Sequence, residues 1–273
     1  MTSATQTASR SAKQVARSEP VKIGVRVGIL SYGVTHLLIA WLALSLAFGG
    51  SRERADQSGA FETLAAQPLG RVLLWVLVIG FAAVALWRLE QTVWGYTYVS
   101  DRAQKLRKRA ASAGKVVLFA VLAVLAARTA ANGSAGGNGG QNATAGVLAL
   151  PGGQLIVGLV GVVIVVVGAV KVKQGWDKRF TEDMDLPTSP HARKVAVRSG
   201  QVGCIAKGVA IALIGALVVL AAVTSRPEEA AGLDVALRTL AAQPYGIVLL
   251  VAVAVGLAAY GVFCAFDARY HRV

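Results

Sequence analysis

Charged residues are scarce in this chain of 273 residues: they make up 15% of the sequence, whereas hydrophobic residues make up 55%. Soluble domains carry roughly 25% charged residues. The shortage argues against a soluble globular surface, a disordered chain and a nucleic-acid-binding domain. With only two cysteines and three histidines, and no zinc-ligand spacing among them, we expect no metal and no cofactor. The composition predicts an integral membrane protein.

Long apolar runs are what the sequence has in abundance. About 20 residues at roughly 1.5 Å rise per residue cross a hydrocarbon core of about 30 Å. The first 22 residues are polar and are expected to form a cytoplasmic tail, and 181–198 is expected to be a cytoplasmic linker. We predict an all-α, polytopic membrane protein with six transmembrane helices, whose spans are 27–48, 69–89, 112–131, 153–172, 202–224 and 245–266.

Positive charge is concentrated on one side of the predicted membrane. Of the 28 lysines and arginines, 22 fall in the tail up to Arg26, in the segments 88–115 and 171–207, and after the last span. Because short loops rich in Lys and Arg stay in the cytoplasm, we expect both termini to be cytoplasmic and the protein to lie in the plasma (inner) membrane. No carboxylate falls inside a span, which removes the usual apparatus of ion-coupled transport.

An internal repeat divides the chain into three units of two spans each. The string Thr-Leu-Ala-Ala-Gln-Pro occurs at Thr63–Pro68 and again at Thr239–Pro244, and a degenerate copy ends at Pro151. Each copy stands just before the second span of its unit. We define repeat 1 as residues 23–100, repeat 2 as 101–180 and repeat 3 as 199–273.

The second span of each unit is predicted to start at its proline. Proline is tolerated in the first turn of a helix, where its missing N–H would have no intrahelical partner. The apolar residues before it can form a short helix on the outer face, so each unit is a hairpin. Because each unit holds two spans, all three point the same way and form parallel repeats. The candidate connector residues are Gln67, Pro68, Gly70, Pro151, Gly153, Gln243, Pro244 and Gly246.

Glycines on the first span of each unit are candidates for close helix packing. Gly33, Gly114 and Gly208 lie 35, 37 and 36 residues before the three prolines, which aligns the first spans as well. Small residues let backbones approach each other in lipid. The candidate packing glycines are Gly28, Gly33, Gly114, Gly203 and Gly208.

Two sets of motifs resemble those of a known family. The first spans of repeats 1 and 3 contain Gly28-Ile-Leu-Ser-Tyr-Gly33-Val34 and Gly203-Cys-Ile-Ala-Lys-Gly208-Val209, and the connectors contain Ala-Gln-Pro-x-Gly at 66–70 and 242–246. With three tandem two-helix units from about Arg26 to Phe266, the chain resembles the bacterial membrane proteins grouped as the domain of unknown function 1206 family. The resemblance implies a fold and no established activity. Repeat 2 departs most, with Ala-Leu-Pro in place of Ala-Gln-Pro.

His36 is the one histidine inside a predicted span. It lies about nine residues into the first span, roughly 14 Å from the inner end. An ionisable side chain at that depth is a candidate ligand or proton site. The other interpretation is a neutral imidazole that hydrogen-bonds to a nearby Ser, Thr or Tyr and serves packing. Val117 and Ile211 are its expected counterparts, so we expect no ring of three polar groups.

Basic side chains mark the inner ends of the spans. We expect Arg88 and Lys171 to extend to the headgroup layer, where Trp87 would belong to an aromatic belt. The basic run that follows lies next to a membrane surface, so anionic headgroups are its nearest partner. The candidate residues for anionic-lipid contact are Arg102, Lys105, Arg107, Lys108 and Arg109.

Sequence motifs for catalysis are missing, including a Walker loop, a dinucleotide fingerprint and a nucleophile elbow. We therefore expect no enzyme. The favoured hypothesis is a non-enzymatic membrane module that interacts with lipids or an unidentified protein partner, and no nucleic acid. The absence of charge inside the spans supports it. The alternative is a passive channel or small-solute transporter with a pocket near His36.

Overall fold

The computed structural model describes residues 19–49, 53–94, 101–136, 139–226 and 232–271. Within these residues the protein is helical, with no strand longer than an isolated bridge, which confirms the all-α fold class. The elements are α2 (Glu19–Ala47), α3 (Gln57–Ala65), α4 (Gly70–Val93), α5 (Arg102–Asn132), α6 (Gly139–Leu148), α7 (Gly153–Trp176), the 3-10 helix η1 (Arg179–Asp183), α8 (Pro190–Thr224), α9 (Leu233–Ala241) and α10 (Gly246–Tyr270).

Six helices, α2, α4, α5, α7, α8 and α10, are long and apolar enough to cross a membrane. Their ends next to the connectors lie close to the predicted ends, but several of the opposite ends extend further. The helix α5 begins at Arg102 instead of residue 112, and α8 at Pro190 instead of 202. The predicted linker 181–198 is therefore helical from Pro190 onward. A helix satisfies its own backbone hydrogen bonds, so it can continue through polar turns beyond the hydrocarbon core.

The connectors α3, α6 and α9 each end in the same turn. Gly70 N donates to Gln67 O at 2.9 Å, Gly153 N to Leu150 O at 2.9 Å, and Gly246 N to Gln243 O at 2.8 Å. The residue before each glycine has a left-handed backbone conformation: Leu69, Gly152 and Tyr245 have φ of 64°, 76° and 59°. A left-handed third residue after a proline is typical of a type II β-turn.

This turn corrects the predicted role of the prolines. Pro68, Pro151 and Pro244 stand two residues before their helices and occupy the second position of the turn, where a fixed φ is favourable. The first helical residue is glycine in every repeat. A Cβ there would overlap a connector carbonyl oxygen, that of Leu64, Val147 or Ala241. The glycine lets the chain reverse direction tightly.

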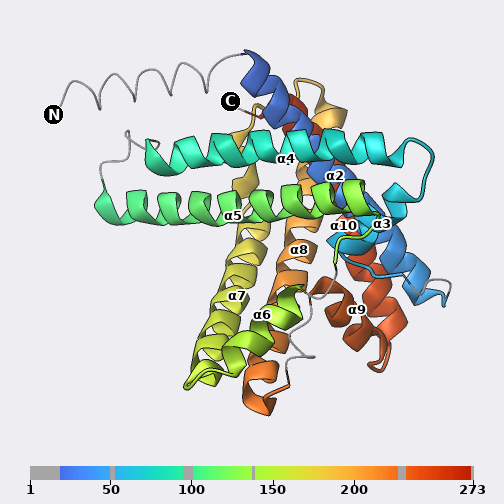
Figure 1. The fold of residues 1–273 in the computed structure, drawn as a ribbon. Coiled ribbons are helices and arrows are strands. Elements are labelled where there is room, and N and C mark those ends of the chain that lie inside the picture. The colour runs from blue at the N-terminus through green and yellow to red at the C-terminus, as the bar shows by residue number, and fades with distance from the viewer. Residues whose placement is uncertain (1–18, 50–52, 95–100, 137–138, 227–231, 272–273) are drawn as a thin grey trace.

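The long helices pack in the spatial order α5, α4, α2, α10, α8, α7. Figure 1 shows α4 and α5 running side by side, α7 and α8 forming a second pair that crosses them steeply, and α2 between the pairs. Within the described residues, α5 and α7 share no extensive contact. The two helices of repeat 2 therefore belong to different halves of the bundle.

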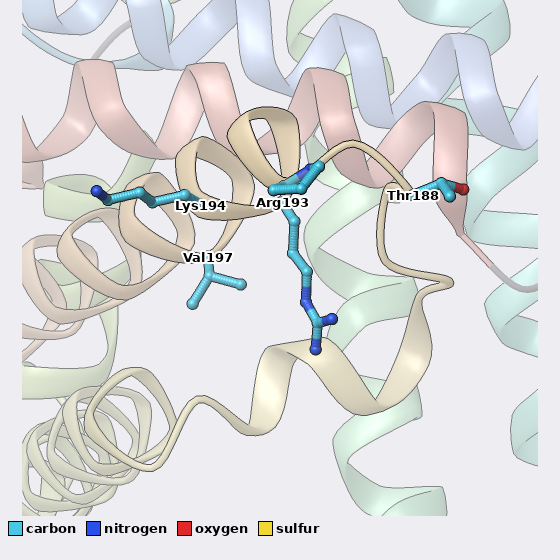
Figure 2. A pocket seen from close by; sticks show the side chains of 5 residues that line it. Thr188, Arg193, Lys194 and Val197 are labelled. Carbon is cyan, nitrogen blue, oxygen red and sulfur yellow. The ribbon is translucent and has the colours of Figure 1, made fainter.

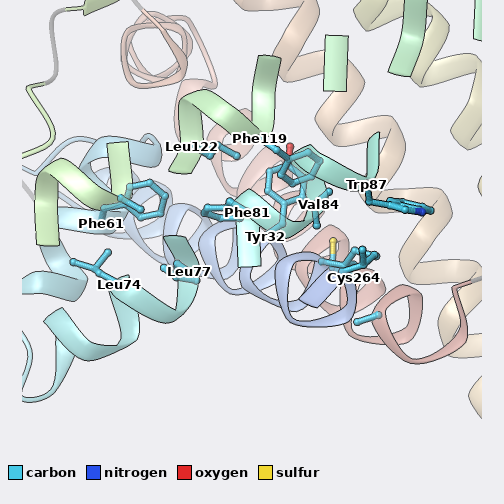
Figure 3. Close-up of a cluster of buried hydrophobic side chains, with 14 of the residues drawn as sticks. Tyr32, Phe61, Leu74, Leu77, Phe81, Val84, Trp87, Phe119, Leu122 and Cys264 are labelled. Atoms are coloured by element: carbon cyan, nitrogen blue, oxygen red, sulfur yellow. The ribbon is translucent and has the colours of Figure 1, made fainter. Parts of the chain in front are cut away.

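Two apolar clusters hold the halves together, and both include α2. The first contains the aromatic residues Tyr32, Phe61, Phe81, Phe119 and Trp87 from α2 to α5 (Figure 3). The second joins α2 to α9 and α10 through Ile39, Leu237 and Leu257 among others. Consequently 61% of the α2 span is buried, compared with 17% of the α7 span.

Glycines stand where helices touch. A Cβ at Gly33 would lie 2.9 Å from the Gly261 carbonyl oxygen, and one at Gly208 would lie 2.8 Å from that of Gly168. A Cβ at Gly28 would overlap the carbonyl oxygen of Gly80. Gly114 contradicts the expectation, because a Cβ there would meet nothing within 4 Å. Its lack of neighbours means that it has no packing role in this bundle.

The connectors also bind loops of neighbouring repeats. Asp234 of α9 accepts the Ala55 N–H at 2.8 Å, and Glu62 of α3 accepts the Ala135 N–H at 3.0 Å. Ala55 and Ala135 are both fully buried. The connector of repeat 3 thus holds the loop of repeat 1, and the connector of repeat 1 holds the loop of repeat 2.

Candidate functional site

His36 lies on α2 with 3% of its surface exposed. Its Nδ1 is 2.8 Å from the Tyr32 carbonyl oxygen of the same helix. Because a carbonyl only accepts, Nδ1 carries the proton and donates. The imidazole centroid lies 4.4 Å from that of Tyr32 and 4.8 Å from that of Tyr260 on α10. Aromatic rings therefore enclose the one histidine that the sequence singled out.

Lys207 is the principal residue that sequence reasoning missed. It projects from α8, and its Nζ donates to the Tyr32 hydroxyl at 2.5 Å. The same Nζ lies 4.2 Å from the Tyr32 ring centroid and 4.1 Å from that of Tyr260. Cations over aromatic faces are attracted by the ring quadrupole, more strongly where water is excluded. Two tyrosines from two helices thus hold one ammonium.

The position of Lys207 corrects an expectation about charge. Lys207 lies inside the span predicted at 202–224 and midway along α8, yet it was counted with the inner basic link. The absence of charge inside the spans, which supported the favoured hypothesis, is therefore wrong. A signal was present in the sequence, since Lys207 stands between the packing glycines Gly203 and Gly208.

Close packing of three helices produces this polar cluster. A Cβ at Gly203 of α8 would lie 2.5 Å from the Tyr260 backbone of α10, and one at Gly33 of α2 would lie 2.8 Å from the Cys264 Cβ of α10. Because the two glycines carry no side chain, α10 fits between α2 and α8. Its Tyr260 ring then faces both His36 and Lys207.

Lys171 of α7 stands next to this cluster. Its Nζ is 3.4 Å from Gln174 Oε1, and it interacts electrostatically with Lys207, Tyr32 and Arg88. It is only half-buried. Arg88 of α4 donates to Gln91 Oε1 at 2.8 Å. Lys171 therefore lies among other cations at the junction of the two halves of the bundle.

Residues around the inner ends pair more closely than the sequence indicated. Trp87 is 6% exposed and meets the His271 ring at 5.3 Å, so it is a core residue and not part of an aromatic belt. His271 Nδ1 lies 2.8 Å from Asp267 Oδ1.

Cys204 and Cys264 are free, buried thiols. Among the described residues, no group of three or more His, Cys, Asp or Glu side chains is arranged to hold a metal ion.

A second set of candidate residues forms the first turns of α5. Arg102 and Arg107 are exposed, whereas Lys105, Lys108 and Arg109 are half-buried. Arg109 donates to the Val93 carbonyl at 3.0 Å and so ties α5 to the end of α4. Three of the five predicted lipid-contacting residues, Arg102, Lys105 and Arg107, have no protein partner among the described residues.

A pocket at the start of α8 adds two basic residues that the sequence did not single out. Its volume is about 370 Å³, and it is lined by Thr188, Pro190, Arg193, Lys194 and Val197. Figure 2 shows Arg193 and Lys194 leaving the first turns of α8 in different directions. Both side chains are exposed.

Comparison with known proteins identifies one relative of similar length. The uncharacterized protein YxxB of Bacillus subtilis (strain 168) is 29% identical over 251 residues, which cover 91% of this chain and 90% of that protein. No solved structure matches the chain.

One family model matches three times in tandem, at residues 27–95, 110–178 and 202–271. The first two matches begin 83 residues apart, whereas the pairing of Gly33 with Gly114 assumed 81. When the two repeats are aligned with a spacing of 83 residues, buried positions of α5 match buried positions of α2. Ser112, Phe119, Leu122 and Ala126 align with Ile29, His36, Ile39 and Ala43, in that order.

This spacing corrects the alignment of repeat 2. Val116 becomes the counterpart of Gly33, Phe119 that of His36, and Lys115 that of Tyr32 and Lys207. The open surroundings of Gly114 follow, because it is not the counterpart of a packing glycine. Three matches over most of the chain confirm the resemblance in the motifs: the protein belongs to the family described as Domain of Unknown Function (DUF1206).

Proposed function

We propose that this protein is a non-enzymatic module of the plasma membrane that binds anionic lipid headgroups through basic side chains at one end of its helix bundle. The observation that carries the proposal is the group of basic residues in the first turns of α5 that have no protein partner among the described residues, Arg102, Lys105 and Arg107. We place this end in the cytoplasm, which is where anionic headgroups attract basic segments beside a span.

The position of these cations within their helix supports an external anion. The amide groups at a helix N-terminus carry partial positive charge, so basic residues in the first turns are disfavoured. Asp101 caps α5 by accepting the Ala103 N–H at 3.0 Å, and basic residues nevertheless follow directly. Basic residues, Arg193 and Lys194, also stand in the first turns of α8, whose N-cap residue Ser189 makes no capping hydrogen bond with its side chain. Headgroup phosphates would offset both arrangements.

Lipid retention tests the proposal. In nanodiscs that mix phosphatidylglycerol with phosphatidylcholine, native mass spectrometry should show retained phosphatidylglycerol on the unmodified protein. The variant R102Q/K105Q/R107Q should keep fewer such adducts, since each basic residue near an anionic surface contributes about 1 kcal/mol. A matched control is R71Q/R128Q, which neutralises two exposed arginines on the outer halves of α4 and α5. Equal retention by the triple variant and the unmodified protein would contradict the proposal.

The surroundings of His36 do not favour the alternative function. A passive channel or small-solute transporter with a pocket near His36 would need space around the imidazole. The rings of Tyr32 and Tyr260 occupy two of its sides at contact distance.

A further inference from the structure

Two lysines stand beside the contact between α7 and α8. A Cβ at Gly208 of α8 would lie 2.7 Å from the Val172 backbone nitrogen of α7, and Lys207 and Lys171 directly precede these two residues. Lys171 of α7 and Lys207 of α8 repel each other electrostatically, and the charge of Arg88 adds to the repulsion at Lys171. Neither lysine forms an ion pair with a carboxylate among the described residues. Lys207 is held by Tyr32 and Tyr260, and Lys171 by a long 3.4 Å contact with Gln174.

Like charges in a membrane interior are costly unless a counter-charge is present. An acidic group that interacts electrostatically with Cys264 of this region is Asp267 of α10, and its carboxylate already contacts His271 at 2.8 Å. The tyrosine faces offset part of the cost for Lys207. They leave Lys171 without an equivalent partner, so the pair as a whole lacks negative charge.

We propose that Lys171 and Lys207, together with the Tyr32 hydroxyl, bind an anionic group with phosphate-type oxygens between α7, α8 and α2. Each ammonium has three N–H donors, and one of those of Lys207 is used by the Tyr32 oxygen. Because that oxygen accepts from Lys207, its own O–H is free to donate. Three donors from three helices can therefore surround one phosphate, which lysines bind as point charges.

The proposed site lies toward the basic end of the bundle. Lys171 lies five residues before the end of α7 at Trp176, and both lysine residues are half-buried. The anion could arrive as free phosphate or as a lipid headgroup. The site uses none of the residues of the surface proposed to bind lipids, so either can fail without the other.

The substitutions K171Q and K207Q in the full-length protein test this site, with K173Q as a matched control because Lys173 is exposed on the same helix. In one arm, inorganic phosphate is titrated into delipidated protein in a maltoside detergent and heat is recorded. In the other, native mass spectrometry counts phosphatidylglycerol retained from nanodiscs. We expect K171Q and K207Q to weaken binding about tenfold or more, since each removes a charged hydrogen bond, and K173Q to change nothing.

The two arms distinguish the source of the anion. Heat from inorganic phosphate that K171Q abolishes would identify a free-anion site. A retained lipid that K171Q loses and R102Q/K105Q/R107Q keeps would identify a headgroup site. If K207Q fails to fold, Y32F takes its place in the comparison with K171Q. Y32F keeps the aromatic ring and removes only the hydroxyl, and it should weaken binding severalfold. Binding in neither arm, or binding that K171Q leaves unchanged, would overturn the proposal.

Discussion

In repeats 1 and 3 the two long helices of each hairpin pack against each other, whereas in repeat 2 they separate, so that α5 packs on α4 and α7 packs on α8. In repeat 1, Gly28 meets Gly80, and in repeat 3, Gly203 meets Tyr260 while Gly256 meets Ala206. The counterparts of Gly28 and Gly80 in repeat 2 are Ala111 and Val163. Side chains at both positions would prevent the close backbone approach that Gly28 and Gly80 allow in repeat 1.

Contacts between repeats follow the same logic. Gly33 and Gly261 bring α2 against α10, and the equivalent pair Gly208 and Gly168 brings α8 against α7. In both pairs, a Cβ added to either glycine would lie 2.7 to 2.9 Å from the carbonyl oxygen of the other glycine, so neither position has room for a side chain. In repeat 2, α7 keeps three glycines that closely contact α8, Gly161, Gly168 and Gly175, whereas the one glycine of α5, Gly114, contacts no neighbouring helix. The helix without packing glycines, α5, is also the one that does not pack against the second helix of its own repeat.

The largest expected difference between the repeats is one of cross-linking. In a background of C204A/C264A, the pair G24C/A83C should form a disulfide within repeat 1, because a Cβ at Gly24 would lie 2.8 Å from the Ala83 Cβ and a small shift reaches disulfide distance. The equivalent pair in repeat 2, R107C/V166C, should not. Disulfide formation in the two pairs is compared by treating the protein with a membrane-permeant oxidant and measuring the loss of free thiols by alkylation and mass spectrometry. Equal yields would show that both hairpins are closed.

Glycine substitution should have the next largest effect. G168L places a side chain 2.7 Å from the Gly208 carbonyl oxygen, which the backbone cannot vacate, and should lower the free energy of unfolding by about 1–3 kcal/mol or more. G114L fills open space and should leave stability unchanged or slightly higher, because leucine favours helix. Thermal unfolding in detergent, followed by a dye that reacts with the buried Cys204 and Cys264, measures both. A similar loss in G114L would refute the corrected alignment.

Connector contacts should show the smallest effect. D234A leaves the buried Ala55 N–H without its partner and should cost about 1–3 kcal/mol. E62A should cost less, because the Glu62 contacts to Ser134 and Ala135 are more exposed. The same thermal assay compares them, with T63A as a control for a half-buried side chain on α3. A larger loss in E62A than in D234A would reverse the assigned order.

Much of the architecture could be predicted from local pattern. Apolar run length located the six spans, and the duplicated Thr-Leu-Ala-Ala-Gln-Pro string located the connectors, because both are properties of a short segment. The alignment of repeat 2 failed by two residues, since Gly114 resembles Gly33 in sequence without sharing its neighbours. The helical start of α8 was missed because polar turns carry no hydropathy signal.

The candidate site was only partly predictable. His36 was recognised by its depth in a span. Lys207 and Tyr260 were not, because their importance depends on α10 lying between α2 and α8, and these helices are far apart in the chain. Spacing along one helix gives no information on which side chain of another helix faces it.

The sequence by itself determined that this is a six-span, three-repeat membrane protein with a basic side, since hydropathy, charge count and repetition require no knowledge of packing. Tertiary structure alone decided that repeat 2 is split between two halves and that Lys207, Tyr32, Tyr260 and His36 share one cluster. The physical reason is steric. In lipid, helices associate where backbones can approach, and whether two glycines face each other is settled only when both helices are placed.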